Sequence, residues 1–457
     1  MHEQNISQIC VDFATNLTLD SVPIDVKEQA QKCLLDWLGC AIRGSVMPQA
    51  DCIKEYAAAM GGNQHASIIG SQTANSAFHA ALCNGYFSHI LEIDDVDKKS
   101  ITHPGAVVIP AALSIGDWQG CTGAELLTAI IAGYEVMLRV GAAVTPAHYE
   151  IWHTTATAGV FGSAVAAGRM LKLDAKAMTW AFGNAGSMAA GLWEFLQDGA
   201  MSKYLHAGKA AAAGVLVSCM AKHGFTGATR ILEGRQGFFA GYARQAVNMD
   251  VFADFGANYH TAGISFKPYP CCRHTHSAID CAIKLNNKLK FSMESIKHIV
   301  IDTYHAAIQV AGNENPADSR QAQFSIKYCV VCALLAGKIN LDSFAETAIF
   351  DQAVRRLMNI TTVVVDETIN NATPVAWPAR ISLELTDGQI MSEYVEYPKG
   401  DPENALTWPE IKDKFSFLVD GILDNSSISE VINMCEELET LKKCSDILRK
   451  VNLNAKF

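Results

Sequence analysis

The sequence is poor in charge: only 18% of its 457 residues are Asp, Glu, Lys or Arg, whereas 49% are hydrophobic. Because so apolar a chain can bury a large core, disorder over most of its length is excluded and more than one structural unit is expected. Basic residues are also the minority, with 36 Lys and Arg against 47 Asp and Glu. The net charge of −11 repels phosphate backbones and anionic membranes, which argues against a nucleic-acid or membrane partner.

Targeting features are also missing. Residues 1–17 contain Glu3 and Asp12 but no basic segment ahead of an apolar stretch, so they do not resemble a secretory signal peptide. No apolar run approaches the roughly 20 residues that a membrane-spanning helix needs. The chain has 14 scattered cysteines, which without an export signal are typical of reduced thiols, so a cytoplasmic location is predicted.

Helical periodicity dominates the first part of the chain. Residues 22–42 repeat apolar side chains at helical spacing, with Pro23 in the opening turn and Gly44 just beyond the end. The same pattern, with many small residues, recurs over residues 76–85, 123–142, 158–171, 175–195 and 207–223. Small residues allow helices to approach closely, so a compact helical bundle is predicted up to about Phe266.

Beyond Phe266, alternating β-branched residues predict strands at 296–304, 361–366, 379–386 and 393–397, interleaved with helices at 276–289 and 320–338. Helical periodicity returns at 409–418 and 428–441. The chain is therefore predicted to be mainly α, with a helical domain built from residues 1–266 and 401–457 and an inserted α+β domain at 267–400. A cleft between two such domains is a favoured place for a ligand site.

The densest group of polar residues lies at 89–105, between two apolar helices. His103 stands there before a Pro-Gly break, on a loop held by helices, where catalytic groups are commonly placed. An imidazole oriented by a carboxylate is suited to proton transfer at neutral pH. A structural turn is the second interpretation. Metal binding is the third, because no H-E-x-x-H spacing accompanies the candidate ligands, which are His89, Glu92, Asp94, Asp95 and His103.

Cations stand in three further segments. His153, followed by Thr154 and Thr155, could hold an anion at a helix start, although capping by a threonine is the more economical explanation. Lys203, ahead of the helix predicted at 207–223, is a candidate ligand for a substrate carboxylate. The prolines of residues 266–276 stiffen a loop that carries Lys267, Arg273, His274 and His276. On this rigid loop the compact ammonium of Lys267 and the planar guanidinium of Arg273 could bind two carboxylates.

For His274 and His276, capping of the following helix and catalysis are equally plausible. Tyr328 could donate its hydroxyl to a substrate, but a buried core tyrosine is the default. Together, loop histidines and several cations fit proton abstraction from a small polycarboxylic acid, because positive groups must neutralise the charge that develops beside an ionised carboxylate.

Several of these segments occur in the order found in the MmgE/PrpD family, and they are residues 35–39, 92–95, 102–105, 153–155, 201–208 and 267–276. The sequence resembles that family over nearly its whole length, most specifically at Lys-Pro-Tyr-Pro-Cys-Cys-Arg-His-Thr-His, residues 267–276. The family includes 2-methylcitrate dehydratase, cis-aconitate decarboxylase and iminodisuccinate epimerase. The resemblance implies a large all-helical domain, an α+β lid domain, a homodimer and metal-independent chemistry, so no cofactor is expected.

By position, the resemblance implies that His103 is the catalytic histidine and His153 a second active-site histidine. It implies that Lys203, Lys267 and Tyr328 contact the substrate.

The acidic segment departs from the family. The dehydratase and decarboxylase branches have Asp-Phe-x-Asp-Thr, whereas this chain has Glu92, Asp94, Asp95 and Val96, with one additional residue before Thr102. Glu92 can replace the acid, and Asp95 remains a candidate substrate contact, but Val96 cannot supply the threonine hydroxyl.

The main hypothesis is a lyase in which His103 and His153 transfer protons while Lys203, Lys267 and Arg273 bind carboxylates, with Glu92 in the catalytic set and Asp95, His276 and Tyr328 among the substrate contacts. The runner-up is an epimerase that uses two opposed acid/base groups. From a different class, the chain could be a non-catalytic helical binding or scaffold protein.

Overall fold

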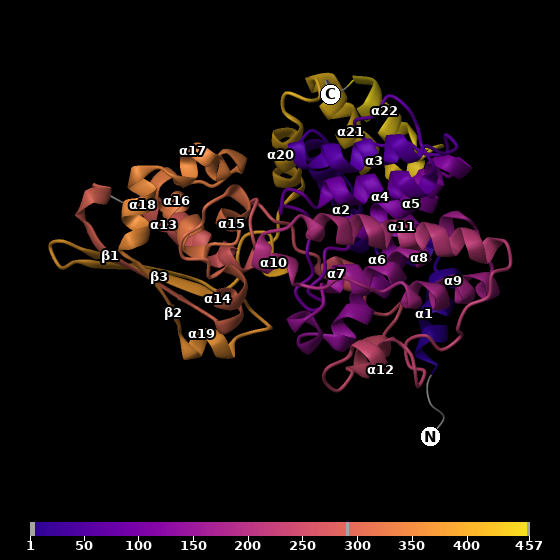
Figure 1. The fold of residues 1–457 in the computed structure, drawn as a ribbon, viewed down its shortest axis with the longest axis horizontal. Coiled ribbons are helices and arrows are strands. Elements are labelled where there is room, and N and C mark those ends of the chain that lie inside the picture. Colours follow the sequence, from indigo (N-terminus) through magenta and orange to yellow (C-terminus); the bar gives the residue numbers. More distant parts are fainter. Residues whose placement is uncertain (1–4, 289–291, 455–457) are drawn as a thin grey trace. The chain divides into compact units, whose positions relative to one another are not determined.

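The computed structural model describes residues 5–288 and 292–454 (Figure 1). The chain divides into two compact units. The helical unit consists of the chain up to Ser265 and from Thr407 onward, and the α+β unit is Phe266–Leu406.

Helices alone build the larger part of the helical unit. They are α1 (Ile6–Asn16), α2 (Ile24–Ser45), α3 (Asp51–Met60), α4 (Ala77–Ser88), α5 (Gly105–Gln119), α6 (Gly123–Val144), α7 (Thr154–Thr157), α8 (Gly159–Met170), α9 (Ala175–Ser187), α10 (Phe195–Asp198), α11 (Ser202–Lys222), α12 (Phe238–Tyr242), α20 (Trp408–Val419), α21 (Asn425–Glu436) and α22 (Asp446–Asn454). Helices α4, α5, α8 and α11 pack on one another, and small residues permit this close approach. A Cβ atom on Gly208 of α11, for example, would lie 2.3 Å from the backbone oxygen of Leu82 in α4.

Helix α6 is the core helix of this unit. A capping box starts it, because Thr122 and Glu125 exchange side-chain and backbone hydrogen bonds. Among the described residues, α6 is the one helix long and apolar enough to cross a membrane, and 94% of its apolar window is buried inside the structure. The prediction that no apolar run approaches this length is wrong for α6. Its two central charged residues, Glu135 and Arg139, pair with each other inside the core.

The α+β unit contains a four-stranded sheet in the order β2-β1-β3-β4. Its strands are β1 (Ile296–Thr303), β2 (Thr361–Val365), β3 (Ala379–Leu385) and β4 (Ile390–Val395), and its helices are α13 (His276–Lys288), α14 (His305–Ala311), α15 (Ser319–Gln323), α16 (Ile326–Ala336), α17 (Glu346–Ile349), α18 (Gln352–Asn359) and α19 (Glu367–Asn371). Strands β1 and β2 are parallel, and the other pairs are antiparallel. Alternate residues of β1 and β3, such as Ile299 and Ile381, are fully buried in one core with α13 and α16.

Three predicted boundaries are corrected. The helix expected at 175–195 ends at Ser187, because the chain then turns through Gly191, whose φ of 145° no helix allows. The helix expected at 320–338 is broken at Ser325, which is extended and caps α16 with its side chain. The helix expected from residue 207 begins at Ser202. Leu289, the last residue of another predicted helix, lies outside the described residues.

The prediction of a mainly α chain is confirmed, with its strands confined to the middle of the sequence. The role of the α+β unit as a lid stays a prediction.

Candidate active site

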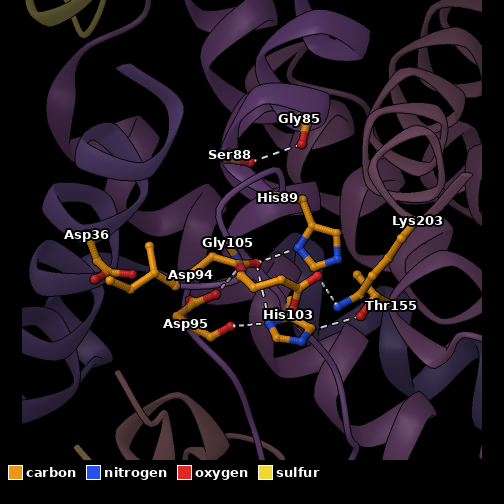
Figure 2. Close-up of polar contacts among 12 residues, drawn as sticks. Asp36, Gly85, Ser88, His89, Asp94, Asp95, His103, Gly105, Thr155 and Lys203 are labelled. Atoms are coloured by element: carbon orange, nitrogen blue, oxygen red, sulfur yellow. Dashed lines mark hydrogen bonds and ion pairs between the residues drawn. The ribbon is translucent and has the colours of Figure 1, made fainter. Parts of the chain in front are cut away.

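Residues 89–104, called the acidic loop here, connect α4 to α5 and carry the main cluster of titratable side chains (Figure 2). His89 directly follows α4, and Pro104 directly precedes α5, so two packed helices hold both ends. Within the loop, one oxygen of Asp94 faces two rings: Oδ2 lies 2.7 Å from Nδ1 of His89 and 3.3 Å from Nδ1 of His103. The predicted grouping of acids and imidazoles therefore forms a His-Asp-His cluster.

The carboxylate of Asp94 is ionised in this setting. Burial opposes its charge, but the charges and hydrogen bonds of His89 and His103 outweigh burial and hold the pKa of Asp94 well below its ordinary 3.8. A buried anion thus stands beside both rings and stabilises a proton on either of them.

His103 presents a defined nitrogen for chemistry. Its Nδ1 lies 2.7 Å from the backbone oxygen of Asp95, which can only accept a hydrogen bond. The proton of the neutral ring must therefore be on Nδ1, and the lone pair on Nε2. The backbone N–H of His103 donates to Oγ1 of Thr155, and 12% of its side chain is exposed, compared with none of the side chain of His89. His103 is the ring of the cluster that a substrate can reach.

Asp95 supports the loop instead of facing solvent. Its Oδ1 accepts the N–H of Gly105 at the start of α5, and its Oδ2 accepts the hydroxyl of Tyr134. Burial, followed by the negative charge of Asp36, raises the pKa of Asp95 to about 8. The structure thus places this predicted substrate contact in a supporting position, with both oxygens engaged and 2% of the residue exposed.

Glu92 and Lys203 form a buried ion pair. Nζ of Lys203 donates to Oε1 of Glu92 over 2.5 Å, and both side chains are at most 5% exposed. Lys203 belongs to the first turn of α11, so the prediction that it lies ahead of the helix is wrong. Glu92 has φ of +56°, a left-handed conformation that is unfavourable for a residue with a side chain and is often found at functional sites.

A second pair of imidazoles, those of His153 and His206, lies near His89. His153 stacks with His89, with ring centroids 5.7 Å apart, and its Nδ1 lies 3.2 Å from Nδ1 of His206 in α11. Burial and the positive charge of His89 lower the pKa of His153 well below 6.5 and that of His206 to about 4. Both rings are therefore neutral near pH 7.

The threonines after His153 do not cap a helix. Helix α7 begins at Thr154, has His153 at its N-cap and has no side-chain cap, so the capping interpretation is wrong. Oγ1 of Thr154 is buried and has no hydrogen-bond partner among the described residues.

A metal could in principle be held by His89, Asp94 and His103, whose ligand atoms lie within 4.8 Å of one another. The two distances to Asp94 are those of hydrogen bonds from ring N–H groups, so protons satisfy this arrangement. The absence of a metal stays a prediction.

In the α+β unit, Lys267 and Arg273 are buried, with 1% and 5% exposed. The guanidinium of Arg273 is paired with Asp401 and donates to the backbone oxygen of Lys399 and to Nδ1 of His276. These contacts connect the loop that begins the unit to the one that ends it.

The other histidine of this loop does not cap α13. Nδ1 of His274 lies 2.7 Å from the hydroxyl oxygen of Tyr304, and its ring stacks on Trp377. The capping interpretation is therefore wrong for His274, and His276 instead contacts Arg273. Tyr328 is fully buried and donates its hydroxyl to the backbone oxygen of Ser343, 2.5 Å away.

Sequence reasoning left His89, Asp94 and His206 out of the proposed catalytic set. The density of acids and imidazoles at 89–103 was a usable signal for the first two, and the three-residue spacing of Lys203 and His206 on one helix face was a signal for the third. Cavity volume does not identify this site, because two cavities of about 520 and 530 Å³ are lined by residues outside the acidic loop.

A buried carboxylate shared by two histidines lies near a lysine and two neutral imidazoles, and together they form a candidate acid–base site in the helical unit. The chain belongs to the MmgE/PrpD family: the N-terminal domain of the family matches residues 8–248, and the C-terminal domain matches residues 269–439. The resemblance predicted from the sequence is thereby confirmed.

Curated relatives span nearly the whole chain. A cis-aconitate decarboxylase of Aspergillus terreus is 27% identical, with 98% of this chain and 96% of the relative covered. A cis-aconitate decarboxylase-like protein of Aspergillus oryzae is 26% identical, with 98% of each covered. The human cis-aconitate decarboxylase is 24% identical, with 96% of this chain and 94% of the relative covered. These matches support lyase chemistry in the broad sense.

Proposed function

We propose that this protein is a lyase that acts on a small di- or tricarboxylate of the aconitate, citrate or methylcitrate kind, with His103 as its principal acid/base group. The observation that carries the proposal is the placement of Nδ1 of His103 between the backbone oxygen of Asp95 and the carboxylate of Asp94. This arrangement directs the lone pair of the neutral ring to Nε2 and stabilises the imidazolium that forms when Nε2 takes a proton.

Either lyase reaction can use this group. In a dehydration, Nε2 of His103 takes the proton from the carbon beside a carboxylate, and a second group protonates the leaving hydroxyl, which departs as water. In a decarboxylation, the carbon–carboxylate bond breaks with loss of carbon dioxide, and the electron pair left on carbon takes a proton from the His103 imidazolium. The nearby anion Asp94 favours the proton-bearing ring in both cases.

Lys203 and His153 are proposed as the assisting groups. Lys203 supplies positive charge against a substrate carboxylate, and its pairing with Glu92 holds the ammonium in place before the substrate binds. His153 is neutral near pH 7 because burial and the charge of His89 lower its pKa, so it can donate a hydrogen bond to a developing negative charge without bringing a charge of its own.

An epimerase of an iminodisuccinate-like dicarboxylate is the second candidate. Val96 is buried and has no hydroxyl where the dehydratase and decarboxylase pattern has a threonine, which weakens the case for those particular reactions. Two different imidazoles, those of His103 and His153, lie near the ring of His89, at centroid distances of 4.9 and 5.7 Å, which also suits proton removal and return by different groups.

A substrate screen in heavy water tests the proposal. Wild-type protein is incubated with cis-aconitate, citrate, 2-methylcitrate, malate and iminodisuccinate, and each mixture is followed by proton NMR and by carbon dioxide release. Loss of water or carbon dioxide, abolished in His103→Ala, is the expected result. Deuterium incorporation with inversion and no loss would replace the lyase with the epimerase, and no reaction with any acid would leave a binding or scaffold protein.

One further assignment rests on the resemblance alone. We propose a homodimer, which light scattering of purified protein tests. The predicted roles of Lys267, Arg273, His276 and Tyr328 as substrate-binding groups, and the cytoplasmic location, likewise stay predictions.

A further inference from the structure

His89 lies in the acidic loop, and the proposed function assigns it no role. The side chain is fully buried, and its Nδ1 is 2.7 Å from Oδ2 of Asp94 (Figure 2). Its other nitrogen, Nε2, is buried and has no hydrogen-bond partner among the described residues. Burying an imidazole nitrogen without a partner costs free energy. The hydrogen bond from Nδ1 to Asp94 is therefore the polar contact by which this buried side chain can influence the site.

That contact is made to the same oxygen that faces His103. Oδ2 of Asp94 accepts from Nδ1 of His89 at 2.7 Å, while Nδ1 of His103 lies farther away, at 3.3 Å. The shorter bond determines how the carboxylate is turned. A donor on this oxygen also reduces the negative charge that the oxygen presents to the other ring.

We propose that His89 is a positioning residue for His103: through Nδ1 it orients the carboxylate of Asp94 and limits how strongly that carboxylate holds a proton on His103. The inference rests on the proposed role of His103 as the acid/base group. His89 does not touch the substrate in this scheme, because its ring is completely buried whereas that of His103 is partly exposed.

Other titratable and charged groups lie around the cluster. They are Asp95, hydrogen-bonded to Tyr134 of α6; Glu92 with Lys203 of α11; His153 ahead of α7; His206 and Lys209 of α11; and Asp36 of α2, paired with Lys414 of α20. A substitution of His89 leaves all of them in the chain. A change in the proton affinity of His103 can then be assigned to the lost contact with Asp94.

The direction of that change follows from the geometry. If His89 is neutral, removing it deprives Asp94 of a donor, and the carboxylate then attracts a proton on His103 more strongly. If His89 is cationic, removing it also removes a repulsive charge. In both cases His103 keeps its proton to higher pH. Removing the carboxylate itself, in Asp94→Asn, has the opposite effect.

The test compares His89→Leu with His89→Asn. Leucine fills the buried space without a donor, whereas the amide nitrogen of asparagine stands near the position of Nδ1 and restores the bond. The rate at which diethyl pyrocarbonate modifies His103, measured by peptide mass spectrometry from pH 5 to 9, gives the midpoint for loss of its proton and needs no substrate. The pH profile of kcat/KM is measured in parallel, and melting temperatures identify variants that do not fold.

The midpoint and the acidic limb of kcat/KM are expected to move upward in His89→Leu, by about half a pH unit or more, and plateau kcat/KM to fall about 10-fold because Asp94 loses its orientation. His89→Asn should restore the wild-type midpoint. In Asp94→Asn, which keeps the shape of the side chain, the midpoint should move downward.

An unchanged midpoint in folded His89→Leu overturns the inference, as does an equal shift in His89→Asn, which would point to packing instead of the hydrogen bond. If His89→Leu does not fold, a midpoint in Asp94→Asn equal to that of the wild type overturns it as well. The chemical modification also separates this inference from the proposed function: a wild-type protein that converts none of the acids refutes the function, while the midpoints still report the coupling of the two rings.

Discussion

In the helical unit, the rings of His89 and His103 face the carboxylate of Asp94, whereas in the α+β unit the ring of His274 faces the hydroxyl of Tyr304. Burial and the charges of Lys267 and Arg273 lower the pKa of His274 to about 4, so this ring is neutral near pH 7. A histidine in a polar loop thus lies beside an anion in the helical unit and beside cations in the α+β unit. Only the first arrangement favours a ring that takes up protons.

The buried ion pairs of the two units differ in a similar way. Arg273 engages Asp401, a backbone oxygen and His276, which connects distant segments of the α+β unit. Lys203 forms a pair with Glu92 beside the imidazoles of the helical unit. We expect the first pair to serve stability and the second to serve chemistry.

The largest effect is expected at His103. His103→Ala should lower kcat/KM about 10³-fold, because it removes the group that transfers the proton. It should leave the melting temperature almost unchanged, since the ring is at the exposed edge of its cluster. Steady-state assays with the best acid of the screen measure the effect, and His223→Ala, an exposed histidine just after α11, is the control. A loss below 10-fold would remove His103 from its assigned role.

The next effect concerns the structural pair. Arg273→Met leaves the fully buried carboxylate of Asp401 without its cation, and breaking such a pair costs about 3–5 kcal/mol of unfolding free energy. Urea denaturation measures this loss.

The double variant Arg273→Met, Asp401→Leu provides the control for the Arg273 pair. It should recover much of the stability, because no buried charge is left unpaired. Full stability in Arg273→Met alone would contradict the structural role of the pair.

The contrast between the histidines of the two units also predicts a pH dependence of stability. The pKa of His274 is lowered from 6.5 to about 4 in the folded protein, first by burial and then by Lys267 and Arg273. Between pH 6.5 and about 4, His274 is therefore protonated in the unfolded chain but not in the folded protein. The free energy of unfolding consequently falls as the pH drops through this range. Each such histidine contributes a slope of about 1.4 kcal/mol per pH unit.

Urea denaturation at several pH values measures this slope, which His274→Gln should make shallower. An equal slope in the wild type and the variant would mean that His274 is protonated in the folded protein.

The smallest effect is expected at Tyr328. Tyr328→Phe removes the hydroxyl that donates to the backbone oxygen of Ser343, which should cost about 1 kcal/mol of unfolding free energy. A fall in kcat/KM of more than 10-fold at nearly unchanged stability would show instead that this hydroxyl reaches the substrate, as the family resemblance implies.

Periodicity in the sequence was sufficient to predict α2, α6 and the strands β1 and β3 to within a few residues, because apolar spacing follows directly from burial on one face. It failed where local contacts decide the conformation. Ser325 interrupts a continuous apolar pattern because its side chain caps α16, and α9 ends before Gly191 because that glycine has a positive φ. Neither event changes the hydrophobic pattern.

By itself, the sequence determined the helical character of the chain, the place of its strands and the grouping of acids and imidazoles around His103, since composition, spacing and motifs carry that information directly. Tertiary structure decided which partner each polar group has. Asp94 contacts two imidazoles, Arg273 pairs with Asp401, and His153 contacts His206, which lies 53 positions later in the chain. The physical reason is that the proton affinity of a buried group depends on the charges packed against it, and those neighbours come together only when the chain folds.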